Sequence, residues 1–90
     1  MNIAFDRIEK IYGKDVINSI IMLKEDVINN IKYFIALGFE EPKEIFERQT
    51  LIFICTNDEF KIKINNLISR LGNNYIEEIE NDISILDELL

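Results

Sequence analysis

The chain has 90 residues, of which 48% are hydrophobic, and a formal net charge of −7 at pH 7. This length suits one domain with its own core, and no apolar run approaches the roughly 20 residues that a membrane-spanning helix needs. The sequence contains no histidine, one cysteine and three widely spaced glycines. It therefore lacks the usual general base, a structural zinc site and a phosphate-binding loop, and we expect no enzyme activity, no cofactor and no metal.

Charge is unevenly distributed along the chain. Residues 1–70 hold all 10 basic residues and 11 acidic ones, whereas residues 71–90 hold six acidic residues and no basic one. An acidic end repels phosphate and anionic lipid and attracts a basic protein surface. We therefore expect no membrane partner and rank nucleic acid below another protein as a partner. The plainer alternative is that these acids only keep a helix face solvated.

The cellular compartment is indicated by the N-terminus and by Cys55. The first residues contain no basic segment followed by an apolar stretch, which is the pattern of a secretion signal. Cys55 lies in an apolar run and has no second cysteine with which to form an internal disulfide. We expect a reduced, cytoplasmic protein in which Cys55 is a buried, inert thiol.

Helical patterns fill the first part of the chain. Residues 2–12 are predicted to form a helix that ends at Gly13, since glycine adopts a positive φ without a steric penalty. Apolar residues then recur at steps of three and four from residue 15 to 37, which predicts one apolar helical stripe. One long helix is an alternative to two helices with a bend at 24–26, where polar residues cluster, and we favour the bend. Gly38 ends this segment.

The middle of the chain allows two interpretations. Pro42 is typical of a first helical turn and predicts a short helix that reaches about Arg48. Residues 50–64 are rich in β-branched and aromatic residues and alternate in part, so a β-hairpin, and with it an α+β fold, is an alternative. Thr56-x-x-Glu59 is a capping box, which starts helices. Apolar residues follow it at helical spacing to Gly72, and this favours a helix.

One final helix is predicted after Gly72. Asn74-x-x-Glu77 again has the spacing of a capping box. Apolar residues then follow at alternating steps of three and four, which is the pattern of a coiled-coil-like contact. These residues are Ile76, Ile79, Ile83, Leu86 and Leu90.

Two stretches of the chain repeat at an offset of 34 residues. Leu37-Gly38, Glu44-Ile45 and Leu51-Ile52 recur as Leu71-Gly72, Glu78-Ile79 and Ile85-Leu86. A period of this length is typical of stacked helical units, each of which cannot bury its apolar face alone. We therefore predict a single all-α domain of five or six short helices in an irregular helical repeat. Its parts are a half repeat or cap (1–27), a repeat (28–61) and a repeat with the acidic C-terminal helix (62–90).

The stretch from Ile28 to Leu90 resembles the repeats of the mitochondrial transcription termination factor family. In those repeats a helix ends in Leu-Gly, a short acidic and apolar helix follows, and an apolar pair leads into the next capped helix. The proline that usually precedes the apolar pair is replaced here by Thr50 and Ser84. The resemblance implies a tandem helical fold and nucleic-acid binding, with Lys32, Lys63 and Arg70 on phosphates.

The leading hypothesis from the residues themselves is a non-enzymatic protein-interaction module, such as a small inhibitor or regulatory subunit. Its final helix would bury an apolar face on a partner and direct acids to basic groups around the rim. The equal alternative is that this face packs onto the preceding repeat within the chain. The alternatives are the minimal nucleic-acid-binding repeat and a structural subunit that folds as a homo-oligomer. The predicted partner-binding residues are Ile79, Ile83, Leu86 and Leu90, with the acids Glu77, Glu80 and Asp87.

Overall fold

The computed structural model describes residues 5–90, which form eight helices and no strand. The elements are α1 (Phe5–Tyr12), α2 (Lys14–Met22), α3 (Lys24–Leu37), α4 (Pro42–Arg48), α5 (Thr50–Phe53), α6 (Asn57–Leu71), α7 (Tyr75–Asn81) and the 3₁₀ helix η1 (Ile83–Leu89). The all-α prediction is therefore confirmed for these residues, and the predicted number of five or six helices is wrong. The chain is divided more often than expected because it also breaks at Gln49 and Asp82.

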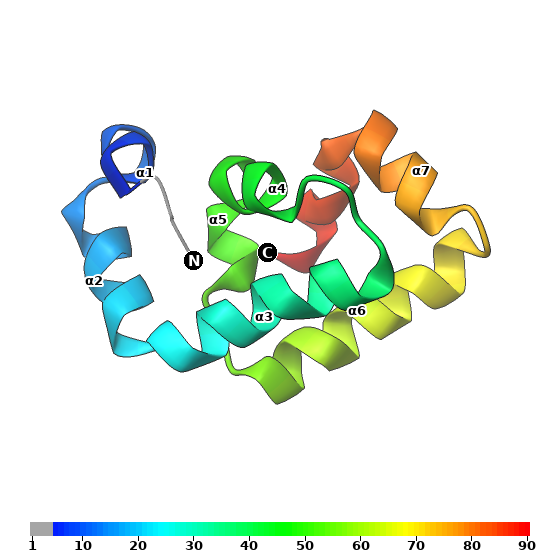
Figure 1. The fold of residues 1–90 in the computed structure, drawn as a ribbon, viewed down its shortest axis with the longest axis horizontal. Coiled ribbons are helices and arrows are strands. Elements are labelled where there is room, and N and C mark those ends of the chain that lie inside the picture. Colours follow the sequence, from blue (N-terminus) through cyan, green and yellow to red (C-terminus); the bar gives the residue numbers. More distant parts are fainter. Residues whose placement is uncertain (1–4) are drawn as a thin grey trace.

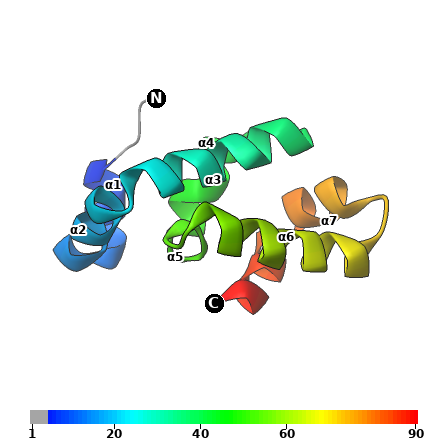
Figure 2. The same ribbon diagram turned by 90° about the horizontal axis from the view of Figure 1, so that it is seen from below.

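The two longest helices, α3 and α6, lie side by side through the middle of the molecule, as the two views in Figures 1 and 2 show. The short helices α4 and α5 pack against α3, and η1 packs against α5 and α7. The helices α1 and α2 lie at one end of the longest axis, which measures 36 Å, and α7 lies toward the other end (Figure 1). The first helices and α7 are thus far apart along this axis.

Glycines end both long helices. The backbone of Gly38 has a φ of +106° after α3, and that of Gly72 has a φ of +82° after α6. These angles favour glycine because a Cβ would clash with the backbone. A short α-helix and a second short helix follow each glycine, so the order of elements in residues 24–53 recurs in residues 57–89.

The core is a cluster of phenylalanine rings between α3 and the elements that cover it. Phe34 of α3 stacks on Phe39 with ring centroids 4.6 Å apart and meets Phe53 of α5 edge to face at 5.1 Å. Phe53 in turn contacts Phe46 of α4 and Phe60 of α6. All five rings are buried. Offset and edge-to-face pairs of this kind add to the burial of apolar area that stabilises the fold.

The hairpin alternative for residues 50–64 is wrong. Thr50–Phe53 is one helical turn, in which the Thr50 hydroxyl donates to the carbonyl oxygen of Phe46 at 2.7 Å. The side chain of Thr56 accepts a hydrogen bond from the backbone N–H of Glu59 at 3.3 Å and begins α6. Residues 50–64 are therefore helical despite their β-propensity. The Thr56 cap contributes to this because it accepts a hydrogen bond from a backbone N–H that has no partner within the first helical turn.

The predicted bend at residues 24–26 is present in the structure, whereas the predicted single helix after Gly72 is not. The chain breaks at Leu23, next to the polar residues at 24–26, so the bend is confirmed. The expected single helix after Gly72 is wrong, since Asp82 has extended backbone angles and separates α7 from η1. Its carboxylate accepts a hydrogen bond from the Ser84 N–H at 3.2 Å, which fixes the turn. The part of the first predicted helix in residues 2–4 lies outside the described residues.

Candidate functional site

The predicted partner-binding residues fall into a buried and an exposed set. Ile79 and Leu86 are buried, and Ile83 is half-buried. The turn at Asp82 directs the apolar sides of α7 and η1 into the fold, where η1 packs against α5. This burial corrects the expectation that Leu86 contacts a partner, whereas Ile79 also lines a groove described below. Leu90 and the acids remain on the surface, and these acids are Glu77, Glu80 and Asp87.

The helix η1 is held in place by Gln49, which lies between α4 and α5. The side-chain amide of Gln49 donates to the carbonyl oxygen of Ile83 at 3.1 Å and to a carboxylate oxygen of Asp87 at 2.8 Å. Asp87 therefore has a partner within the chain. It is less free to meet a basic group on another protein than Glu77 is.

A groove with an acidic rim lies between α4 and α7, and we call it the acidic groove. Glu41 and Glu44 line its α4 side, and Glu80 lines its α7 side. The remaining lining residues are Arg48 and the isoleucines Ile45, Ile79 and Ile83. Three carboxylates and one guanidinium give the rim of the groove a net negative charge. The three isoleucines form its apolar floor.

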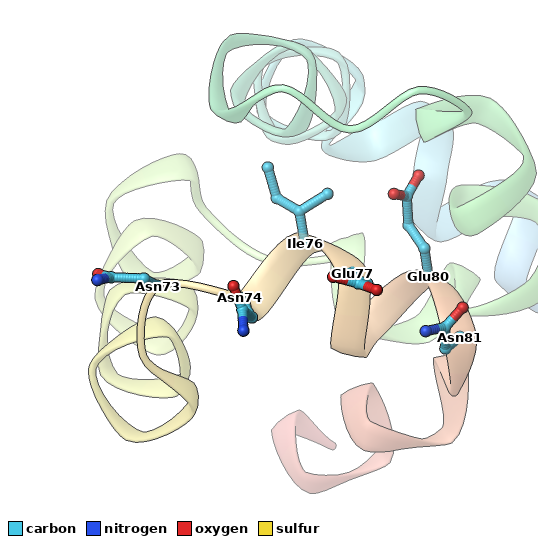
Figure 3. Close-up of a pocket in the computed structure, with 6 residues that line it drawn as sticks. All are labelled: Asn73, Asn74, Ile76, Glu77, Glu80 and Asn81. Carbon is cyan, nitrogen blue, oxygen red and sulfur yellow. The ribbon is translucent and has the colours of Figure 1, made fainter.

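Glu80 also lines a second hollow on the outer side of α7, shown in Figure 3 with Asn73, Asn74, Ile76, Glu77 and Asn81. Ile76 and Glu80 project from the same side of α7, toward the segment between α3 and α4 (Figure 3). A carboxylate oxygen of Glu80 accepts a hydrogen bond from the Glu40 N–H at 3.4 Å. A Cβ on Gly38 would lie 3.3 Å from the Ile76 side chain, so the turn after α3 and helix α7 approach closely. The two hollows thus share Glu80 as a lining residue.

The basic residues of the nucleic-acid hypothesis are largely engaged in ion pairs. Lys63 contacts Glu59 at 3.3 Å, and Arg70 contacts Glu88 of η1. Lys63 and Arg70 line one hollow between α6 and η1, whereas Lys32 on α3 is exposed and is not among its lining residues. The structure brings two of the three predicted residues together, next to a carboxylate that opposes phosphate binding.

The exposed apolar surface that sequence reasoning missed lies on α1 and α2. Phe5 and three isoleucines, Ile17, Ile20 and Ile21, line a hollow there together with Lys24. Ile21 and Met22 lie off the stripe of Val16, Ile20 and Leu23 that faces the core. An apolar pair outside the helical stripe is the signal that could have revealed this surface.

Cys55 lies between α5 and α6 and is half-buried rather than fully buried. Burial raises the pKa of its thiol above the ordinary value of 9.0, an effect that Lys63 opposes and that Glu59 and Asp26 reinforce. A thiol with a raised pKa stays protonated at neutral pH and is a poor nucleophile. Within residues 5–90, no group of three or more potential ligand side chains is placed to hold a metal ion.

None of the helices described here is both long and apolar enough to cross a membrane. No family model, curated protein or solved structure matches the chain. The resemblance to mitochondrial transcription termination factor repeats therefore stays a prediction.

Proposed function

We propose that this chain is a non-enzymatic interaction module, acting as a small inhibitor or regulatory subunit, that binds a basic amphipathic segment of a partner protein. The acidic groove is the observation that carries the proposal. Its rim of Glu41, Glu44 and Glu80 surrounds an apolar floor. A helix with lysine or arginine along the edges of an apolar stripe matches this arrangement, since its stripe covers the floor and its cations meet the rim.

Charge in the rest of the chain supports the same class of partner. Residues 71–90 carry six acidic residues and no basic one, and α7 adds Glu77 beside Glu80. The resulting field attracts a basic partner at long range and accelerates encounter. The docking surface proposed here keeps Ile79, Glu80 and Ile83 from the sequence prediction, and Glu77 lines the neighbouring hollow on α7. It replaces the buried face of the C-terminal helices with the groove between α4 and α7.

The recurring order of elements supports the interpretation of the chain as an irregular helical repeat. Stacked repeats commonly present binding surfaces built from equivalent elements of successive units. The short helices α4 and α7 occupy equivalent places after Gly38 and Gly72, and they form the two walls of the acidic groove. The groove is therefore a surface between two equivalent parts of the chain.

A fluorescence-anisotropy titration tests the proposal. The probe is a labelled synthetic helix with leucines on one face and lysines along its edges. We expect saturable binding that weakens as salt rises. The double substitution Glu44→Lys and Glu80→Lys should lower affinity by at least about tenfold, which corresponds to about 1.4 kcal/mol.

The matched control is Glu9→Lys with Glu25→Lys, which changes the net charge equally at exposed positions on α1 and α3. This control should retain most of the affinity, because charges far from the groove act only through a screened field. Equal losses in both variants would show general charge attraction and would contradict a site in the groove.

A further inference from the structure

The acidic groove carries its charges in a fixed order along α4. Glu41, Glu44 and Arg48 stand at positions i, i+3 and i+7, so they share one face of the helix, and all three line the groove. Glu41 and Arg48 are seven residues apart, which is about 10 Å along the helix axis. One end of the groove is therefore acidic, and Arg48 places a positive charge at the other end.

Two hydrogen bonds fix which part of the second wall lies at each end. The Glu40 N–H donates to the Glu80 carboxylate at 3.4 Å, so Glu80 of α7 lies beside the start of α4. The Gln49 side-chain amide donates to the carbonyl oxygen of Ile83 at 3.1 Å, so η1 begins beside the end of α4. The third carboxylate of the rim therefore belongs to the acidic end and not to the end that holds Arg48.

The charged side chains that line the groove are not used in ion pairs with the rest of the described chain. Within residues 5–90 the ion pairs are formed by Arg7, Lys63 and Arg70, and none of them includes a residue that lines the groove. Glu47, which precedes Arg48 in the chain, pairs with Arg7 at 3.3 Å. Arg48 and the rim carboxylates therefore have charge left to pair with a partner, positive at one end and negative at the other.

We propose that the partner helix carries one carboxylate, which meets Arg48, in addition to the cations that meet the acidic end of the groove. This inference rests on the proposed function and specifies its partner. A lysine placed against Arg48 would be repelled, so Arg48 discriminates against partners that are basic along their whole length. Charges that mirror those of α4 have the same spacing on the partner. The edge of the partner that faces α4 therefore has the pattern Glu-x-x-x-Lys-x-x-Lys.

The order of these charges also determines the direction of the bound helix. An acid in the first turn and lysines in the last turn stabilise a helix because they complement its dipole, and glutamate four residues before lysine is the favourable order for a pair. With this order, the carboxylate near the partner's N-terminus lies against Arg48, and the two lysines lie against Glu44 and Glu41. The partner helix is therefore antiparallel to α4.

Fluorescence anisotropy with two probe helices tests the pattern. Both probes have a leucine face and the two lysines, and the position that meets Arg48 is glutamate in one probe and lysine in the other. We expect the wild-type chain to bind the glutamate probe at least about threefold more tightly. General attraction to a chain of net charge −7 would favour the more basic lysine probe instead. In the variant Arg48→Glu, the order of the two affinities should reverse.

The matched control is Lys43→Glu, which makes the same change of charge at an exposed position of α4 that does not line the groove. This control should keep the wild-type order of affinities. Arg48 is also exposed, and a helical circular dichroism spectrum verifies that both variants fold. A nitroxide label at the N-terminus of the glutamate probe should broaden the amide signals of Arg48 and Gln49 more than that of Glu41. The opposite result would refute the antiparallel direction.

Two other results would overturn the inference. One is a lysine probe that binds the wild-type chain as tightly as the glutamate probe or more tightly, and the other is an unchanged order of affinities in Arg48→Glu. If that binding is still lost in Glu44→Lys with Glu80→Lys, docking in the acidic groove stands and only the charge pattern of the partner fails. Absence of binding by both probes would contradict the proposed function and, with it, this inference.

Discussion

The side-chain amide of Asn30 on α3 donates a hydrogen bond to the carbonyl oxygen of Phe53 at 2.8 Å. The same amide nitrogen donates to the carbonyl oxygen of Cys55 at 3.1 Å, and the Asn30 carbonyl accepts from the Asn57 side chain at 3.0 Å. Asn30 is buried, and each of its polar atoms has a partner. It therefore ties α3 to the turn between α5 and α6, where it adds a donor to the Phe53 carbonyl, which also accepts from the Cys55 N–H, and gives a donor to the Cys55 carbonyl.

Replacement of Asn30 by alanine should destabilise the fold by about 1–3 kcal/mol, since it removes three hydrogen bonds, to the Phe53 and Cys55 carbonyl oxygens and from the Asn57 side chain. The control is Asn29→Ala on the exposed side of the same helix, which gains the same helix propensity and should change stability by less than about 0.5 kcal/mol. Urea denaturation followed by circular dichroism measures both variants. Equal stability of the two would show that the Asn30 bonds do not hold the turn.

Apolar packing, rather than its surface ion pair, should hold η1 in place. Leu86 is fully buried, so Leu86→Ala should cost about 2–5 kcal/mol. Arg70 and Glu88 pair across the surface, and Arg70→Gln should cost less than about 1 kcal/mol. Thermal and urea unfolding of the two variants compare these contributions. A larger loss for Arg70→Gln than for Leu86→Ala would contradict the arrangement of η1.

Ionisation of Cys55 should make stability depend on pH. Burial raises the pKa of the folded thiol above 9.0, so the unfolded chain loses this proton first. The stabilisation from Cys55 is therefore complete below the unfolded pKa and is lost as pH rises through the folded pKa. Urea denaturation of wild type and Cys55→Ala from pH 7 to pH 10 isolates the effect. The difference in unfolding free energy between wild type and Cys55→Ala should shrink toward pH 10. A difference that stays constant from pH 7 to pH 10 would contradict a raised pKa of the folded thiol.

Nucleic-acid binding should be weak because Lys63 and Arg70 already pair with Glu59 and Glu88. We expect no saturable binding of short DNA or RNA at about 0.15 M salt, where screening leaves little long-range attraction. Fluorescence anisotropy with single- and double-stranded oligonucleotides checks this. Saturable, salt-sensitive binding that is lost when Lys32, Lys63 and Arg70 are replaced by glutamate would instead favour the family resemblance as a guide to function.

Sequence patterns predicted the helix ends well where one residue decides the local geometry. Gly38 and Gly72 end the long helices, and Thr56 begins α6, because a positive φ or a capping oxygen acts within a few residues. The break at Asp82 was missed because the apolar spacing of Ile79, Ile83 and Leu86 is the same for one helix as for two that pack inward. The local signal in the sequence is Asp82 followed by Ser84, whose N–H donates a hydrogen bond to the Asp82 carboxylate.

The candidate site was predictable only in part. The acidic character of α7 is visible in the sequence, and Glu77 and Glu80 were identified. A spacing pattern predicts that Ile79 and Leu86 are apolar contacts, but it does not distinguish contacts within the chain from contacts with a partner. The acidic groove joins Glu41 and Glu44 to Glu80, which lies more than 30 residues away in the chain, so it follows only from the packing of α4 and α7.

The most direct test of the central claim is an NMR titration of the ¹⁵N-labelled chain with the leucine- and lysine-containing helix. The amide signals of Glu41, Glu44 and Ile45 on the α4 side, and of Glu80 and Ile83 on the α7 side, should shift most. The exposed residues Asn29 and Asp58 on α3 and α6 should shift little. Shifts spread evenly over all exposed acids, or confined to α1 and α2, would contradict a partner site in the acidic groove.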